Sequence, residues 1–331
     1  MPAVREPFGT LPDGTEIELV VLRNRAGMEV AVSSLGATVQ SLVVDDVDVV
    51  LGYAVLDGYL AGNPAYFGGI VGRYANRIRD AAFFLDGRRY VLDPNEWPHS
   101  LHGGSAGLDR RPWQVVDVSA GAVVLSCLSP DGEMGYPGAL SVVATYSLAD
   151  GELRLDLEAA TDADTVVNLA SHIYWNLAGE GTVDAHLLRV PAVRHVAVDA
   201  ELIPTGDLAS VEGTALDFRR PSPVGANTRG FDVTFVLDEP GSPALAAELL
   251  EPRSGRRLTL LTSEPGLHVY SGERLPLAGP GKSGRPYPPR GGLALEAQHF
   301  PDSPNHPEFP STVLRPGETF RSTTVWRLLE G

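Results

Sequence analysis

Residues 83–92 read FFLDGRRYVL, and this stretch gives the clearest local indication of the fold. Asp86 and Gly87 stand between two apolar runs, and an Asp-Gly pair in that setting is a strong signal for a tight β-hairpin. Toward the N-terminus, residues 16–22 (EIELVVL) and 29–34 (EVAVSS) flank a glycine-containing loop and predict a second hairpin. Similar strand patterns recur along the chain, at residues 113–118, 122–128, 140–148, 152–160 and 165–172.

Two later segments require a choice between alternatives. Residues 243–263 contain ALAAELLE, which looks helical, but the turn cluster EPRSG and the alternating RRLTLLT after it predict another hairpin. Residues 276–292 (PLAGPGKSGRPYPPRGG) are either an interdomain linker or a long surface loop. Strand-like sequence resumes at 293–298, and the residues that remain are too few for a further domain, so a loop is expected.

The composition agrees with these patterns. The 36 glycines and 27 prolines among 331 residues leave little room for long helices and favour short strands joined by turns. A hydrophobic share of 43% with 21% charged residues is typical of a globular chain. We therefore expect an all-β protein in which residues 1–331 form a single domain, a large antiparallel β-sandwich.

The charge and the cysteine count limit the partners. A net charge of −16 repels phosphate backbones and anionic lipid heads, so neither nucleic acid nor a membrane surface is an expected partner. No apolar run approaches the length of a membrane span, and residues 1–14 have no apolar signal-peptide core, so we expect a cytoplasmic protein. The single cysteine, Cys127, excludes an internal disulfide and a multi-cysteine metal site. The oligomeric state stays open.

Three of the eight histidines stand in settings that suit a binding site. His102 lies in LHGG, where the glycines permit a close backbone approach. His172 ends a strand pattern in NLASHIYWN, whose aromatic rings and amides suit the apolar faces and hydroxyls of a sugar. His268 alternates with apolar residues in GLHVY. Each is also compatible with an ordinary surface or core-edge histidine. No HExxH or closely spaced ligand set appears, so we expect no metal.

Among the charged residues, Glu296 lies in the strand pattern GLALEAQ, where a half-buried acid needs a partner or a role. The alternative is a solvated glutamate on the outer face of the strand. Asp232, in GFDVTF, presents the same choice. Asn76 and Arg77, in GRYANRI, fit either an ordinary turn or the recognition of hydroxyl groups.

Two glycine-rich segments match known sequence motifs but lack the neighbouring secondary structure that those motifs require. Residues 279–284 (GPGKSG) have the GxGxxG spacing, yet prolines crowd both sides where a dinucleotide site needs a strand and a helix. Residues 103–107 (GGSAG) spell a nucleophile elbow, but the proline at 112 leaves too little room for the helix that must follow. We expect flexible loops at both, and no nucleotide cofactor.

Taken in order, several segments resemble the aldose 1-epimerase (galactose mutarotase) family over almost the full chain. The segments that carry the resemblance are residues 34–40 (SLGATVQ), 63–69 (NPAYFGG), 72–78 (GRYANRI), 101–104 (LHGG), 130–138 (PDGEMGYPG), 171–177 (SHIYWNL), 295–298 with 301–302 (LEAQ and PD), and 314–318 (LRPGE). Each is weak alone, but their number and their order are specific.

The resemblance implies a large twisted β-sandwich with one open sugar groove, and an enzyme that interconverts the α and β anomers of aldohexoses such as glucose and galactose without a cofactor. Carried over by motif, His172 is the general acid and Glu296 is the general base. The residues implied in binding the sugar are Asn76, Arg77, His102, Asp232 and, beside the groove, Tyr174 with Trp175. Proximity of the acid and the base would favour a charged pair.

The chain departs from the family at His268, where a glutamine is usual, and at residues 95–100 (NEWPHS). Position 268 normally helps to bind the sugar, so His268 is a candidate binding residue and the preferred sugar is open. Two alternatives also remain: an enzyme of the same fold that acts on a phosphorylated or otherwise modified sugar, and a non-catalytic sugar-binding module.

Overall fold

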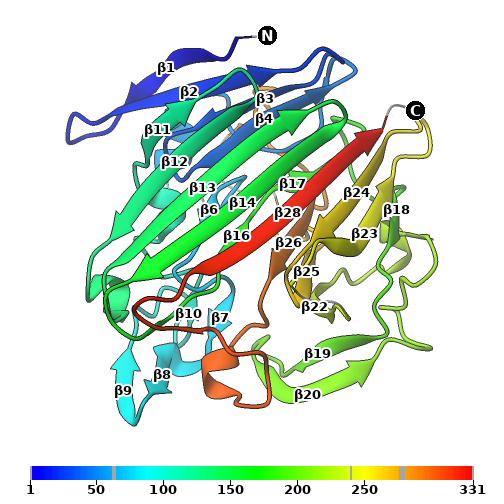
Figure 1. The fold of residues 1–331 in the computed structure, drawn as a ribbon. Helices are drawn as coiled ribbons and strands as arrows, with labels where there is room; N and C mark the ends of the chain where they lie inside the picture. The colour runs from blue at the N-terminus through cyan, green and yellow to red at the C-terminus, as the bar shows by residue number, and fades with distance from the viewer. Residues whose placement is uncertain (1, 62–64, 239–240, 276–279, 330–331) are drawn as a thin grey trace.

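The computed structural model describes residues 2–61, 65–238, 241–275 and 280–329 (Figure 1). The central element is a nine-stranded sheet, and its strands pair antiparallel throughout. Its strands are, in spatial order, β11 (Gln114–Val118), β12 (Ala122–Ser129), β13 (Leu140–Ala149), β14 (Glu152–Thr161), β28 (Phe320–Leu329), β24 (Arg257–Thr262), β23 (Ala244–Leu250), β18 (Leu187–Arg189) and β21 (Ser222–Pro223).

Two further sheets pack near it. A six-stranded sheet has the order β17 (Tyr174–Trp175), β26 (Leu293–Gln298), β25 (Gly266–Tyr270), β22 (Asp232–Val236), β19 (Arg194–Val198) and β20 (Pro204–Ser210). A five-stranded sheet follows chain order through β1 (Val4–Thr10), β2 (Glu16–Arg23), β3 (Glu29–Ser33), β4 (Thr38–Val44) and β5 (Val47–Asp48).

The remaining elements are short. Two-stranded ladders join β7 (Arg77–Ile78) to β10 (Ser100–Leu101), β8 (Ala82–Leu85) to β9 (Arg88–Val91), β6 (Ile70–Val71) to β16 (Ala170–Ser171), and β15 (Thr165–Val166) to β27 (Val313–Leu314). The helical segments are α1 (Leu56–Leu60) and the 3-10 turns η1 (Arg79–Ala81), η2 (Leu108–Arg110), η3 (Glu133–Gly135), η4 (Val224–Ala226) and η5 (Ser303–Asn305).

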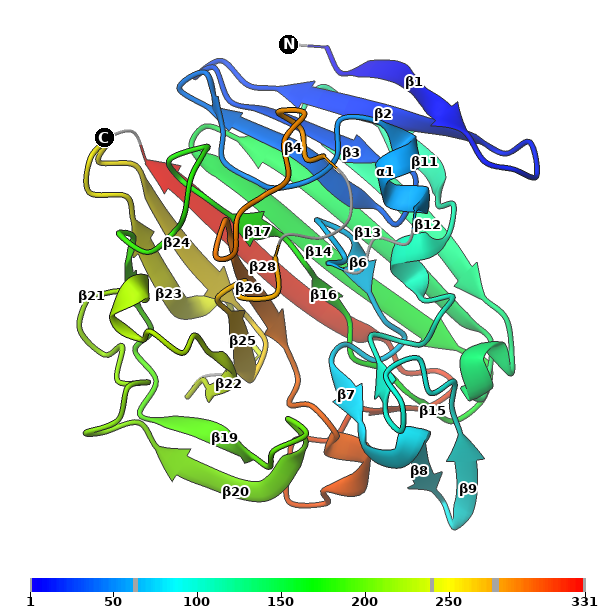
Figure 2. The same ribbon diagram turned by 180° about the vertical axis from the view of Figure 1, so that it is seen from behind.

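The core lies between the nine-stranded sheet and the other two sheets, which cover one of its faces (Figure 2). Burial alternates strictly along β13 and most of β14, as expected for strands with one face on a core. Trp175 of β17 and Trp326 of β28 meet across the layers with their ring centroids 6.0 Å apart. The expected all-β sandwich is confirmed.

The local predictions agree with these elements. Asp86 and Gly87 have φ angles of 49° and 78°, and positive φ at both turn positions is what a tight two-residue hairpin between β8 and β9 needs. The hairpins predicted at 16–34 and 243–263 are β2–β3 and β23–β24. The single strand predicted at 165–172 is wrong. This run is split into β15 and β16, because the two halves pair with different partners, β27 and β6.

The predicted loop at 276–292 falls partly outside the described residues, since its first four positions are not among them. From 280 to 292 no strand or helix is formed. Lys282, the only lysine of the chain, fixes this loop to the five-stranded sheet. Its ammonium donates to Asp48 Oδ2 at 2.6 Å and to the carbonyl of Val50 at 2.9 Å.

No helix in the described part of the chain has the length and hydropathy of a membrane-spanning segment.

Candidate active site

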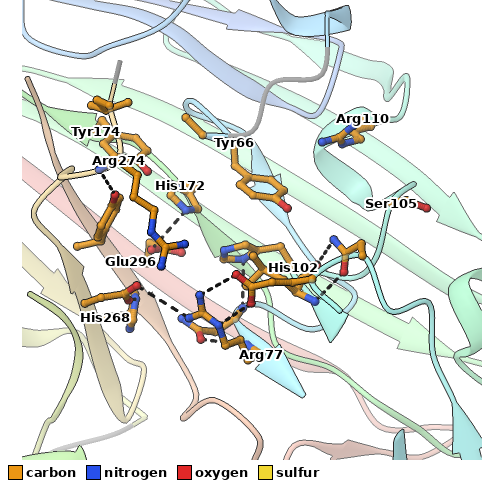
Figure 3. A pocket seen from close by; sticks show the side chains of 18 residues that line it. Tyr66, Arg77, His102, Ser105, Arg110, His172, Tyr174, His268, Arg274 and Glu296 are labelled. Carbon is orange, nitrogen blue, oxygen red and sulfur yellow. Dashed lines mark hydrogen bonds and ion pairs between the residues drawn. The ribbon is translucent and has the colours of Figure 1, made fainter. Parts of the chain in front are cut away.

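A cavity of about 410 Å³ is lined by residues of the six-stranded sheet and of the loops beside it (Figure 3). It brings together all but one, Trp175, of the nine residues singled out from the sequence as catalytic or binding candidates. Its lining consists of Ala65, Tyr66, Asn76, Arg77, Asn95, Glu96, Leu101, His102, Ser105, Arg110, His172, Tyr174, Asp232, His268, Tyr270, Arg274, Leu275 and Glu296.

Glu296 reaches the cavity from β26, in the interior of the six-stranded sheet. All six residues of this strand are buried, and Glu296 is only 1% exposed. The solvated glutamate considered from the sequence is therefore excluded. One carboxylate oxygen, Oε2, is buried without a hydrogen-bond partner among the described residues. A buried carboxylate is costly unless it has a partner, so this oxygen is a natural acceptor for a ligand.

His172 lies between β16 and β17, and its backbone is fixed to a glycine pair. Its N–H donates to the carbonyl of Gly69, and its carbonyl accepts from the N–H of Gly68, both at 2.9 Å. Gly68 has a φ of 67°, and a Cβ there would stand 2.2 Å from the carbonyl oxygen of Val39. Only glycine allows this approach, which explains the FGG sequence before the site.

The imidazole of His172 is held between two tyrosine rings. Tyr66 stacks on it with ring centroids 5.6 Å apart and Tyr174 with centroids 5.1 Å apart, at interplanar angles of 27° and 26°. Stacking on both faces fixes the plane of the imidazole and leaves its edge to face Glu296. Tyr66 was not found from the sequence, where only its surrounding motif was noted.

His172 Nε2 lies 3.6 Å from Glu296 Oε1, and His172 is 4% exposed. Burial lowers the pKa of His172 below its ordinary 6.5, although the carboxylate of Glu296 acts in the opposite direction. The proximity of Glu296 favours the charged form of His172, as expected, but desolvation outweighs this attraction.

His102 faces the same place from the LHGG segment. Its Nδ1 accepts a hydrogen bond from the backbone N–H of Asn76 at 3.1 Å. Burial, with the nearby charges of His172 and Arg77, lowers the pKa of His102 well below 6.5. The ring is therefore neutral with its proton on Nε2, so it offers a donor to a ligand. Gly103 has a φ of 89°, and a Cβ there would overlap the carbonyl of Gly72.

Arg77 is fixed by an acid that sequence reasoning missed. Its guanidinium forms a two-pronged ion pair with Glu96, with Nε–Oε2 and Nη2–Oε1 distances of 2.6 and 3.0 Å. Burial opposes the charge of Arg77, but Glu96 and Asp232 outweigh it and raise the pKa of Arg77. In the sequence, residues 95–100 stand out only as a departure from the family pattern. No pattern in the sequence around Glu96 indicates that its carboxylate pairs with an arginine 19 positions earlier.

Asp232 and His268 form a second pair. His268 Nε2 lies 2.8 Å from Asp232 Oδ1, and His268 Nδ1 lies 2.9 Å from Thr234 Oγ1. Asp232 Oδ2 is 4.0 Å from Nη1 of Arg77, so the carboxylate stands between the histidine and the arginine.

Three ligand atoms of His102, His172 and Glu296 lie within 4.8 Å of one another, a spacing that a metal ion could bridge. The donor set does not fit a metal. His102 Nδ1 already accepts the Asn76 N–H, so Nε2 keeps its proton and has no lone pair to give. The absence of a metal stays a prediction from the sequence, and this tautomer is a second argument for it.

Other placements differ from those expected from the sequence. The expectation that Trp175 lies beside the groove is wrong. Its neighbour Tyr174 lines the cavity, while Trp175 points to the opposite face of the strand and is fully buried in the core. The GGSAG segment leads into the three-residue turn η2, so no nucleophile elbow forms, although Ser105 lines the cavity. Of the GPGKSG motif, position 279 lies outside the described residues, and residues 280–284 adjoin no helix.

Two arginines also line the cavity and were not proposed. Arg110 and Arg274 enter it from different sides (Figure 3). Arg110 Nε is 3.7 Å from Asp109 Oδ2, whereas the guanidinium of Arg274 has no ion-pair partner in the part of the chain that the structure describes.

Comparison with known proteins gives consistent results. A family profile described as aldose 1-epimerase matches residues 18–327. The chain is 44% identical to the galactose mutarotase of Rattus norvegicus, over 98% of this chain and 97% of that one, and 35% identical to the aldose 1-epimerase of Escherichia coli K12, over 96% and 97%. The solved structure of an aldose epimerase homologue from C. elegans superposes with a TM-score of 0.90 at 31% identity, covering 94% of this chain and 98% of that one.

Proposed function

The chain belongs to the aldose 1-epimerase family, and we propose that its cavity opens and closes the ring of an aldohexose with His172 as the general acid and Glu296 as the general base. The protein is an enzyme, an aldose 1-epimerase that interconverts α and β anomers. The observation that carries the assignment of roles is the buried pair itself, a histidine and a carboxylate 3.6 Å apart at the floor of a polar cavity.

The reaction needs two proton transfers, one from the hydroxyl oxygen on C1 and one to the ring oxygen O5. Glu296 takes the proton of the C1 hydroxyl, the C1–O5 bond breaks as the aldehyde forms, and His172 delivers a proton to O5. Rotation about C1–C2 then presents the other face of the aldehyde, and the reversed transfers close the ring as the other anomer. Both reacting oxygens are bonded to C1, so an acid and a base that lie close together suit the chemistry.

The lowered pKa of His172 has a consequence for this scheme. At neutral pH the imidazolium is a minority form, but it is a stronger acid than an ordinary histidine and gives up its proton more readily to O5. The stacked rings of Tyr66 and Tyr174 keep the imidazole edge aimed at the reacting oxygens.

The remaining polar groups of the cavity would hold the hydroxyls. His102 offers its Nε2 proton, the guanidinium of Arg77 is held in place by Glu96, and Asp232 offers a carboxylate oxygen as an acceptor. We propose these residues with Asn76 and Tyr174 as the binding set, to which His268 belongs through its contact with Asp232. Asn76 acts at least in part by shaping the turn, since its φ is 66° and its side chain accepts the N–H of Arg77.

We also propose that residues 1–331 work as one domain, because the cavity draws on segments from position 65 to position 296. A cytoplasmic location is part of the proposal. The free and buried Cys127 suits a reducing compartment.

Polarimetry tests this function. Freshly dissolved α-D-galactose and α-D-glucose should approach their equilibrium rotation faster with the protein than without it, in a saturable manner. Saturable binding of the sugar without acceleration would instead identify a binding module.

A phosphorylated or acidic aldose is the second candidate substrate. Arg110 and Arg274 line the cavity, and an anionic substituent would meet the guanidinium of Arg274, which has no ion-pair partner among the described residues. Comparing kcat/KM for galactose and for glucose 6-phosphate decides between the neutral and the anionic sugar.

A further inference from the structure

Three neighbouring strands of the six-stranded sheet present one polar row to the cavity. Thr234 of β22 is the register partner of His268 on β25, which in turn is the partner of Glu296 on β26. Directly paired residues point to the same face of a sheet, and so does Asp232, two positions before Thr234. The sheet therefore places the histidine between the aspartate and the proposed base.

Both ring nitrogens of His268 are already occupied. Nε2 faces Asp232 Oδ1 at 2.8 Å, and because a carboxylate only accepts, this nitrogen carries a proton. Nδ1 faces Thr234 Oγ1 at 2.9 Å, where the hydroxyl can accept from or donate to the ring. His268 is 6% exposed and Thr234 is 3% exposed, so neither contact is replaced by solvent. No nitrogen of the ring is left for a sugar.

We propose that His268 is a positioning residue: it fixes Oδ1 of Asp232 so that Oδ2 is presented to a hydroxyl of the sugar, and makes no hydrogen bond to the sugar itself. This inference rests on the proposed function. Asp232 can play its part, since its side chain is 23% exposed and its Oδ2 stays 4.0 Å from the nearest guanidinium nitrogen of Arg77. Arg77 is itself held by Glu96. The carboxylate of Asp232 would therefore meet the sugar between two fixed neighbours, His268 and Arg77.

The charges around His268 support a fixed pair. Burial lowers the pKa of His268, but the hydrogen bond and charge of Asp232 and the charge of Glu296 outweigh it, so the pKa is raised above 6.5. Burial likewise opposes the charge of Asp232, and His268 and Arg77 outweigh it, so the pKa of Asp232 is lowered. The titratable and charged groups that face the pair from the surrounding elements are Glu296, Arg77, His102, His172, Tyr270 and Arg274.

A double-mutant cycle separates positioning from direct contact. His268→Leu removes both ring nitrogens and should raise KM for galactose about tenfold, with kcat within about threefold, because a ground-state contact of Asp232 is loosened. In the Asp232→Ala background the same change should alter KM by less than about twofold. If the two effects multiply instead, His268 touches the sugar on its own and the proposal is overturned.

The conservative variant provides a rescue. A glutamine amide can donate to Asp232 Oδ1, so His268→Gln should return KM to within about threefold of the wild type. His195→Gln, on β19 and outside the cavity, is the matched control and should leave KM unchanged. A His268→Gln variant as impaired as His268→Leu would contradict the positioning role.

Two readouts do not depend on turnover. Calorimetric Kd values for galactose, measured in the same four proteins, should show the same non-additivity even if mutarotation is not accelerated. The NMR titration midpoint of His268 should lie above 6.5 and fall in Asp232→Ala. A His268 midpoint that does not change in Asp232→Ala would contradict the His268–Asp232 pair. If polarimetry alone shows no acceleration, the proposed function is overturned and the pair is not.

Discussion

Nε2 of His172 and Oε1 of Glu296 lie 3.6 Å apart, yet they come from segments more than 120 positions apart in the sequence. The imidazole is clamped by tyrosines and the carboxylate is fixed in a strand whose every residue is buried. Both groups are thus held in place in the absence of a sugar, and preorganisation of this kind favours the proposed proton transfers.

The pair should account for most of the acceleration. His172→Asn and Glu296→Gln should each lower kcat by about 10²–10⁴-fold, because each removes one proton-transfer group and retains a similar shape. Polarimetry with galactose measures the loss, circular dichroism checks the fold, and His195→Asn serves as the control histidine. A folded variant with near-wild-type kcat would remove that residue from the mechanism.

The pH profile follows from the burial of His172. The acid must be protonated to act, and its pKa lies below 6.5, so kcat/KM should decline as the pH rises through that lower value. Rates measured from about pH 4.5 to pH 8 locate the midpoint. Titration of His268 would appear as a separate limb above 6.5. A midpoint for the main decline that lies above 6.5, and stays there in His268→Gln, would contradict the assignment.

Chelation should leave the activity intact. Among the described residues, the one cluster with ligand-like spacing keeps a proton on His102 Nε2, because the Asn76 N–H occupies the other ring nitrogen. Dialysis against EDTA, followed by polarimetry, tests this expectation, with re-addition of zinc as the comparison. Activity that is lost on dialysis and restored by one metal would refute it.

Asp109 should limit stability at neutral pH. It is 7% exposed, neither carboxylate oxygen has a hydrogen-bond partner in the described residues, and burial raises its pKa to about 7. A raised folded pKa favours the protonated form, so the contribution of this group is fully present below 3.8 and is lost as the pH rises toward 7. Asp109→Asn should therefore increase the free energy of unfolding above pH 7 by up to about 4 kcal/mol.

Denaturant unfolding at about pH 4 and about pH 7.5 measures this effect, and the gain should appear only at the higher pH. Asp150→Asn, in an exposed turn, is the matched control and should change little. A variant no more stable than the wild type at the higher pH would show that the buried carboxyl costs nothing.

Much of the fold was predictable because the turn and the two strands of a hairpin are neighbours in the sequence. Asp86-Gly87 and the turn at 251–255 each join two strands that are consecutive in the sequence and pair with each other. The place of β28 was not predictable. It lies between β14 and β24, which are about 170 and 70 positions earlier in the chain, and nothing in its own sequence indicates these partners. The break at 165–172 has the same origin, since two separate partners divide one apolar run.

The site divides in the same way. His172 and Glu296 were found through motifs, whereas Tyr66 and Glu96 were missed because their roles arise only from contacts made in three dimensions, a stack on His172 and an ion pair with Arg77. Trp175 was misplaced because adjacent residues of a strand point to opposite faces, and only the pairing of β17 shows which face is the cavity.

The attachment of Lys282 bears on chemical durability. Mutarotation passes through a free aldehyde, and aldehydes condense with unprotonated amines to form imines, the first step of glycation. The only lysine amine of the chain is held by Asp48 and the Val50 carbonyl, with its side chain 17% exposed. Incubation with concentrated glucose, followed by mass spectrometry of the peptides, should show no hexose adduct on Lys282. Burial lowers the pKa of Lys282, and Asp48 only partly offsets this, so Asp48→Asn should lower that pKa further and admit an adduct on the uncharged amine.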